Sequence, residues 1–116
     1  SLADNLAFAL PANVTARQAA VDAALAAAGL AGMGARDPAT LSGGEAARAA
    51  LMRSLLAQPQ AILLDEPFSK LDTALRAEIR AFAFDHIRAR AIPALIVTHD
   101  SSDAQAASGP VISLQL

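Results

Sequence analysis

Two short apolar runs without polar alternation constrain the fold of this 116-residue chain most strongly. They cover residues 61–64 (Ala-Ile-Leu-Leu) and 94–97 (Ala-Leu-Ile-Val). Such runs are typical of strands that are buried on both faces in a parallel sheet. Between them, the spacing of Leu75, Ile79 and Phe82 predicts a long helix over 72–90. This order predicts an α/β fold whose parallel strands are joined by right-handed crossovers, with function at their carboxyl ends.

Glycine, proline and capping residues bound the remaining predicted elements. We expect, in chain order, a loop over 1–5 with an apolar turn over 6–10, a helix over 16–28 capped by Thr15, a helix over 42–58, a short helix over 101–107 and a last strand over 111–116.

Composition excludes several classes of protein. The length allows one small domain, and 54% hydrophobic residues indicate a packed core. A net charge of −2 is the wrong sign for binding nucleic acid or an anionic membrane surface through charge. No apolar run approaches the ~20 residues that a membrane span needs, so direct membrane insertion is not expected. The absence of cysteine excludes disulfides and thiolate metal sites.

Ser42 and Glu45 are spaced as a capping box, in which each side chain satisfies a backbone amide at the start of a helix. That interpretation does not explain Gly43 and Gly44, because each glycine costs about 1 kcal/mol in a helix. A helix start with bare backbone and a serine hydroxyl suits an anion, best a phosphate.

Asp65 and Glu66 stand where the first predicted strand ends. Neighbouring carboxylates repel each other unless a cation or hydrogen bonds compensate, and a magnesium ion would do so. Successive strand residues point in opposite directions, so Asp65 could hold Mg²⁺ while Glu66 polarises a water. By themselves, the two acids are more typical of surface carboxylates in a strand-to-turn connection than of a catalytic pair.

Three further residues enter the site hypothesis or are set aside from it. Asp72 is a good N-cap for the long helix. His99 follows the second predicted strand and would lie beside Glu66 if the two strands are neighbours. His86 continues the apolar stripe of the long helix, so we interpret it as a packing residue.

The ordered motifs LSGGE (41–45), AILLDEP (61–67), SKLD (69–72) and THD (98–100) resemble the second half of an ABC-type ATPase. The resemblance implies a partial P-loop NTPase (RecA-like) parallel sheet with part of the ABC α-helical subdomain. It implies two parts, 1–58 from the helical subdomain with the signature motif and 59–116 from the carboxyl-terminal ATPase core.

The resemblance also implies roles for single residues. Ser42, Gly43 and Gly44 match the signature loop, which contacts the γ-phosphate of ATP bound to the opposite subunit of a head-to-tail dimer. Asp65 matches the Mg²⁺-binding Walker B aspartate, and Glu66 matches the general base. Asp72 matches the D-loop aspartate at the dimer interface, and His99 the histidine that senses the γ-phosphate.

The phosphate-binding motif G-x-x-x-x-G-K-[S/T] is absent, because Lys70 is the only lysine and Ser69 precedes it. We therefore expect a truncated carboxyl-terminal portion that does not hydrolyse ATP alone. Loss of the first half of an α/β domain would also expose apolar surface around residues 61–64.

The function implied is ATP hydrolysis coupled to solute transport, with import favoured by the segment LDEPFSKLD (64–72). The implied partners are membrane-embedded permease subunits and a second ATPase subunit, which would place the protein in the cytoplasm on the inner face of the cell membrane. An ATPase head of a DNA-repair or chromosome-structure protein is the alternative, although the chain lacks heptads and net positive charge. A non-catalytic fragment of the same fold is a third possibility.

Overall fold

The computed structural model describes residues 1–114. The chain divides into two compact units, one formed by residues 1–60 and one that begins at residue 61. Each unit is described by itself.

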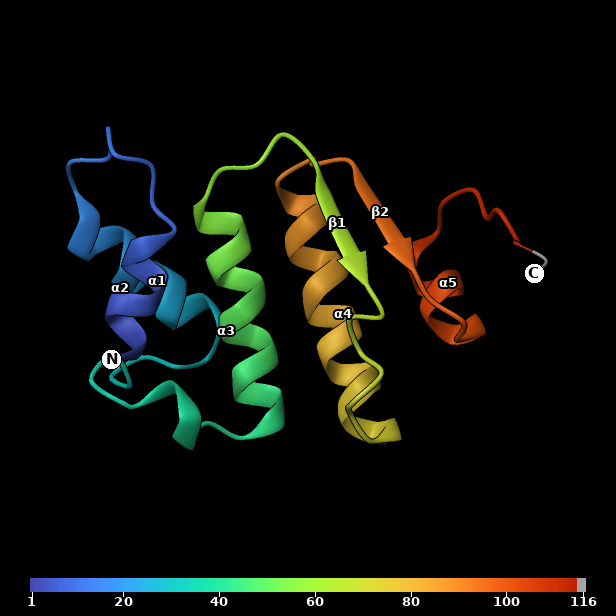
Figure 1. Ribbon diagram of the computed structural model, residues 1–116, viewed down its shortest axis with the longest axis horizontal. Coiled ribbons are helices and arrows are strands. Elements are labelled where there is room, and N and C mark those ends of the chain that lie inside the picture. The colour runs from blue at the N-terminus through green and yellow to red at the C-terminus, as the bar shows by residue number, and fades with distance from the viewer. Residues whose placement is uncertain (115–116) are drawn as a thin grey trace. The chain divides into compact units, whose positions relative to one another are not determined.

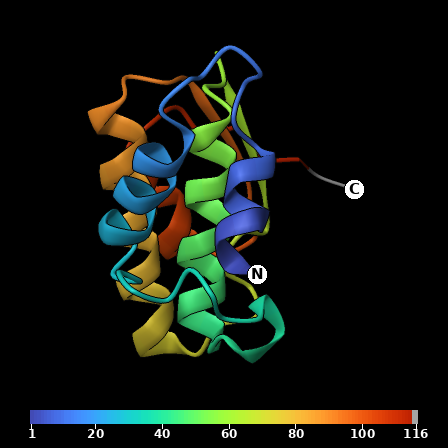
Figure 2. The ribbon, with the colours of Figure 1, turned by 90° about the vertical axis from the view of Figure 1, so that its left-hand side faces the viewer.

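The first unit is helical. It contains α1 (Leu2–Phe8), α2 (Arg17–Ala27), the 3₁₀ helix η1 (Pro38–Thr40) and α3 (Gly43–Leu56). The helices α1, α2 and α3 contact one another in pairs (Figure 2). The largest fully buried side chains of this unit are those of Leu2, Leu6, Leu30 and Met52.

Two predictions for the amino-terminal region are wrong. Residues 2–8 form a helix instead of a loop, because Ser1 accepts a hydrogen bond from the Asp4 amide and Leu2 and Leu6 bury one side of the turn. Thr15 does not cap α2, whose N-cap is Ala16 without a side-chain hydrogen bond. The predicted apolar stripe of this helix is confirmed, since Val21 and Leu25 are buried.

The second unit contains β1 (Ile62–Asp65), α4 (Thr73–Ala89), β2 (Ala94–Val97) and α5 (Ser101–Ala107). The two strands are parallel, with Ile62 opposite Ala94 and Asp65 opposite Val97 (Figure 1). The predicted strand, helix, strand order and the parallel pairing are confirmed. Helix α4 runs along one face of the strands. Because the strands are parallel, their carboxyl ends lie at the same edge.

Burial of the strands on both faces was a wrong expectation. Ile62 is buried, whereas Leu63 and Leu95, which are register partners, are 64% and 65% exposed. Since α4 lies on one face only, the other face is uncovered in the chain as described. The expected apolar exposure around residues 61–64 is therefore confirmed.

The last predicted strand does not form over residues 111–114, and residues 115–116 lie outside the described part of the chain. Val111, Ile112 and Leu114 are exposed. A strand needs a hydrogen-bonded neighbour, and the sheet that the structure describes pairs only β1 with β2.

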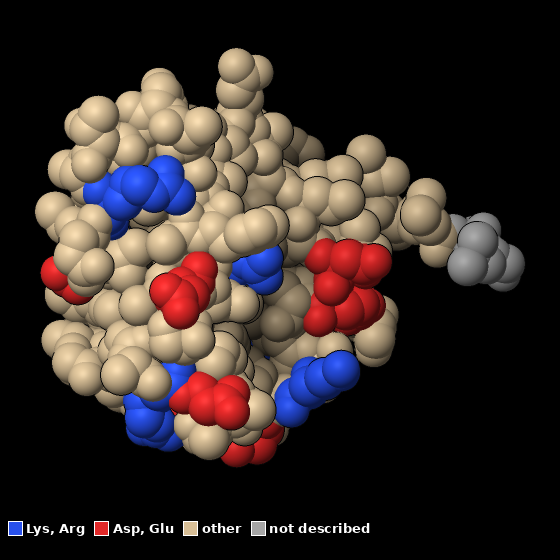
Figure 3. Space-filling view, turned by 60° about the vertical axis from the view of Figure 1, so that its left-hand side comes forward, with Lys and Arg blue, Asp and Glu red and all other residues tan. Residues whose placement is uncertain are grey.

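Charged side chains are spread over the surface. On the face drawn in Figure 3, basic side chains stand apart from one another among acidic and uncharged ones. Within residues 1–114, no helix has both the length and the apolar character needed to cross a membrane.

His86 packs on Phe82 of the same helix, with the ring centroids 4.4 Å apart, which confirms its interpretation as a packing residue. Burial lowers the pKa of His86, and the nearby Arg90 lowers it further. The unfolded chain therefore binds the proton more readily than the folded chain does.

The stabilisation from neutral His86 is thus present above the ordinary pKa of about 6.5 and is lost as pH falls through the lowered pKa of the folded state. We expect His86→Gln to flatten the decline in unfolding free energy between pH 7.5 and 5.5, measured by urea titration. Identical pH dependence in the parent chain and the variant would contradict this expectation.

Candidate functional site

The segment after β1 changes direction at Glu66. Its backbone N–H still donates to Val97 O at 2.7 Å, which continues the parallel pairing by one residue. Its φ of +47° then places it in the left-handed region, which costs a residue with a side chain about 1–2 kcal/mol. This conformation is unusual because Pro67 follows, and a residue before proline favours extended backbone. Such strained positions concentrate at functional sites.

The structure brings Glu66 and His99 together, as the sequence predicts for neighbouring strands. His99 Nδ1 lies 2.5 Å from Glu66 Oε1. An ionised carboxylate can only accept hydrogen bonds, so Nδ1 of the imidazole is the donor. The Glu66 side chain is 31% exposed and that of His99 is 87% exposed, so the pair is open to a ligand or a water.

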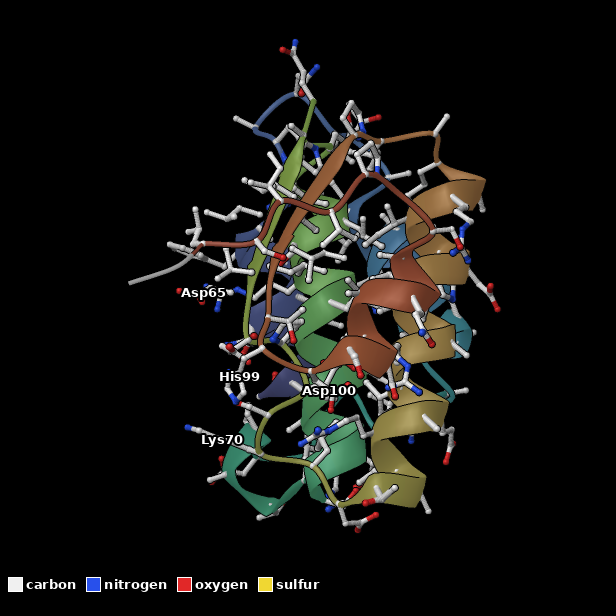
Figure 4. All side chains as sticks on the ribbon, turned by 90° about the vertical axis from the view of Figure 1, so that its right-hand side faces the viewer. Asp65, Lys70, His99 and Asp100 are labelled. Carbon is white, nitrogen blue, oxygen red and sulfur yellow. The ribbon has the colours of Figure 1, made fainter. Side chains whose placement is uncertain are left out.

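Asp65 takes the side of the sheet opposite to α4. Figure 4 shows its side chain, together with those of His99 and Lys70, on the side of the strand ends that faces away from this helix. Asp65 is exposed and stands opposite Val97 in the register. The carboxyl edge of the two strands therefore presents the Asp65 carboxylate, the His99 imidazole and the Lys70 ammonium group to one side.

Asp72 ends the segment that begins at Glu66. Its side chain accepts a hydrogen bond from the Leu75 amide at 3.0 Å, so the predicted N-cap of α4 is confirmed. Within the segment, the Ser69 hydroxyl donates to Glu66 O at 3.2 Å. Local hydrogen bonds thus hold the loop from Glu66 to Asp72, both within the loop and at its junction with α4.

Asp100 organises the segment after β2. Its Oδ1 accepts hydrogen bonds from the amides of Ser102 and Asp103, which caps α5. The Asp103 amide is the largest cause of a lowered pKa for Asp100, and the Ser102 amide and Arg76 lower it further. Asp100 is therefore held as an anion directly beside His99.

Sequence reasoning missed two arginines of α4. Arg76 pairs with Asp100 at 2.8 Å, and Arg80 pairs with Asp103 at 2.8 Å. The Thr98 hydroxyl also donates to Asp103 at 3.2 Å. One signal was available, because an arginine near the start of a helix opposes the helix dipole unless it has an anionic partner.

Ser42 begins α3 in the first unit. Its hydroxyl accepts from the Glu45 amide at 3.2 Å, and its own amide donates to Glu45 Oε1 at 2.9 Å, which confirms the capping box. The Ser42 amide is the main cause of the lowered pKa of Glu45. Gly43 and Gly44 form the first turn of α3, where Gly43 is exposed and Gly44 is buried. The amides at the start of a helix have no carbonyl partner within the helix.

The donor set at the sheet edge suits magnesium. Mg²⁺ prefers oxygen ligands and is commonly held by one or two carboxylates together with substrate phosphates. Asp65 offers an exposed carboxylate at the end of β1. Among residues 1–114, no three acidic or histidine side chains are grouped so that they could hold a metal ion by themselves.

Comparison with known proteins identifies the family of this chain. The ABC transporter family matches residues 1–69, which is more than half of the chain. This chain belongs to the ABC transporter family. The match includes the capping box at Ser42 and the acids Asp65 and Glu66 at the end of β1.

Relatives of this ABC transporter chain are ATP-binding proteins. It is 56% identical over 110 residues to the uncharacterized ABC transporter ATP-binding protein YnjD of Escherichia coli K12, covering 93% of this chain and 51% of YnjD. It is 42% identical over 104 residues to the aliphatic sulfonates import ATP-binding protein SsuB 2 of Burkholderia cenocepacia HI2424, covering 90% of this chain and 38% of that protein. The chain thus spans about half of the length of YnjD and 38% of the length of SsuB 2.

A solved ABC transporter in an inward-facing conformation has the same fold. It superposes with a TM-score of 0.78 at 22% identity, over 91% of this chain and 46% of that one. The predicted fold class, a partial P-loop α/β sheet with part of the ABC helical region, is confirmed.

Proposed function

We propose that this chain forms part of the ATP-hydrolysing subunit of an ABC transporter, which couples ATP binding and hydrolysis to solute transport. The observation that carries the proposal is the 2.5 Å contact between His99 and Glu66 at the carboxyl ends of two parallel strands. Ligands of open parallel sheets bind at this edge. We call the longer protein of which this chain would be a part the intact subunit.

Glu66 has the position and exposure of a general base. Its carboxylate can accept a hydrogen bond from a water and then its proton, while His99 holds the carboxylate through Nδ1. His99 is also exposed enough to meet a terminal phosphate. Asp65 would hold Mg²⁺, which when bound neutralises charge that develops on the phosphate oxygens.

The remaining site residues would act across a subunit interface. We assign Ser42, Gly43 and Gly44, at the start of α3, to the γ-phosphate of ATP bound by a second subunit. We assign Asp72, at the start of α4, to the interface of that head-to-tail dimer. Under this proposal residues 1–58 belong to the helical subdomain and residues 59–116 to the ATPase core.

The transport partners follow from the family. Membrane-embedded permease subunits would carry the solute, and the ATPase would lie on the cytoplasmic side of the membrane in contact with them. SsuB 2 is named as an import protein, which supports import as the direction. Both relatives carry ABC transporter or import names, and this favours transport over the ATPase head of a DNA-repair or chromosome-structure protein.

The 116-residue chain alone is expected to release no phosphate from ATP above background, because its sequence has no G-x-x-x-x-G-K-[S/T] loop to cradle the phosphates. The intact subunit is expected to hydrolyse Mg-ATP. Phosphate release by both proteins at equal concentration tests the proposal. Turnover by the isolated chain at the rate of the intact subunit, or none by an intact subunit that carries the loop, would contradict it.

A further inference from the structure

Arg76 joins the two loops that end the strands. In the loop after β1, its guanidinium donates to three backbone carbonyls, those of Phe68 at 3.0 Å, Ser69 at 3.2 Å and Leu71 at 3.4 Å. In the loop after β2, it donates to Asp100 Oδ2 at 2.8 Å. One side chain of α4 therefore contacts both segments that carry the candidate site.

In each loop, the groups that Arg76 contacts lie within a few residues of Glu66 or His99. Glu66 is joined to the first loop by the hydrogen bonds that Ser69 donates to Glu66 O from its hydroxyl and its amide. His99 immediately precedes Asp100, whose other oxygen is fixed at the start of α5. A shift of the guanidinium would thus move Glu66 and His99 relative to each other.

The contact is partly shielded from water. The side chain of Arg76 is 25% exposed and that of Asp100 is 30% exposed. Phe68, which provides one of the carbonyls, is buried and packs edge-on against Phe84 of α4, with the ring centroids 5.8 Å apart. The arginine therefore acts on a loop that is already fixed at one point.

We propose that Arg76 is a positioning residue for the reaction, which sets the distance between Glu66 and His99 by holding both loops on α4. This inference rests on the proposed function for its effect on turnover, but the coupling of the two loops does not depend on it. Lysine could keep the ion pair with Asp100, but its single ammonium group lacks the planar fork that reaches several carbonyls at once.

The decisive variant is therefore Arg76→Lys in the intact subunit, beside Arg76→Ala. We expect both to lower kcat for ATP roughly 10- to 100-fold, as misplacement of reacting groups by about 1 Å can do. KM for ATP should stay within about twofold, because Arg76 contacts protein groups alone among those described. Arg90→Ala is the matched control, since this arginine bonds only to His86 in the contacts described.

Hydrogen exchange of the same variants provides a measurement that is independent of ATP hydrolysis. Exchange should become faster in residues 66–72 and 98–103 together, while α4 keeps the protection of the parent protein. If Glu66→Gln retained turnover, the proposed function would fail, yet this paired change in exchange would still test the coupling.

Three results would overturn the role of Arg76. Full turnover in Arg76→Lys would show that the ion pair alone suffices. Faster exchange in only one of the two loops would show that Arg76 does not couple them. Loss of protection throughout α4 would assign the residue to stability alone.

Discussion

Replacing Glu66 with glutamine is expected to stop ATP turnover by the intact subunit, lowering kcat roughly 10²- to 10⁴-fold. Glutamine keeps the size of the side chain and can still accept a hydrogen bond from His99, but it cannot take a proton from water. The contact of 2.5 Å between Glu66 and His99 makes this residue the best placed base at the sheet edge. Steady-state phosphate release measures the effect.

The matched control is Glu78→Gln, which removes a carboxylate from an exposed position of α4. This variant should hydrolyse ATP at the rate of the parent protein. That result would show that the loss of one negative charge does not by itself cause the loss of turnover in Glu66→Gln. Comparable turnover in Glu66→Gln and in the parent would show that Glu66 is not the base.

Arg80→Ala is expected to lower the free energy of unfolding of the chain by about 3–5 kcal/mol. The side chains of Arg80 and Asp103 are only 17% and 3% exposed, and their charged groups are 2.8 Å apart. Removal of the arginine leaves a buried carboxylate whose remaining side-chain partner is the Thr98 hydroxyl. Urea unfolding followed by circular dichroism measures the loss.

The double variant Arg80→Leu with Asp103→Leu separates the cost of an unpaired charge from the loss of packing. Because apolar residues of similar volume can replace a buried ion pair, its stability should equal or exceed that of the parent. An Arg80→Ala variant as stable as the parent would show that the pair adds nothing to the fold.

The sequence predicted those parts of the site that depend on residues close together in the chain or on the pairing of two strands. The capping box of Ser42 and Glu45 needs only a spacing of three residues, and it is present. The prediction that His99 lies beside Glu66 required one assumption, that the two apolar runs form neighbouring parallel strands. The strand register and the contact between the two side chains confirm it.

The parts that the sequence could not predict depend on distant packing. Arg76 and Asp100 are separated by 24 positions, so their pairing is visible only once α4 and α5 are placed. The left-handed backbone of Glu66 has no sequence signal, since the following proline favours extended backbone. Leu63 was expected to be buried but is exposed. An apolar run indicates a strand, but it does not show which faces of that strand are covered.

The most direct test of the central claim measures nucleotide bound by the Glu66→Gln form of the intact subunit. If the sheet edge and the start of α3 belong to one ATP site completed by a second copy, Mg-ATP should convert this variant from monomer to dimer with two nucleotides retained, as light scattering and nucleotide analysis of the isolated species would show. A protein that stays monomeric and nucleotide-free at saturating Mg-ATP would contradict the account.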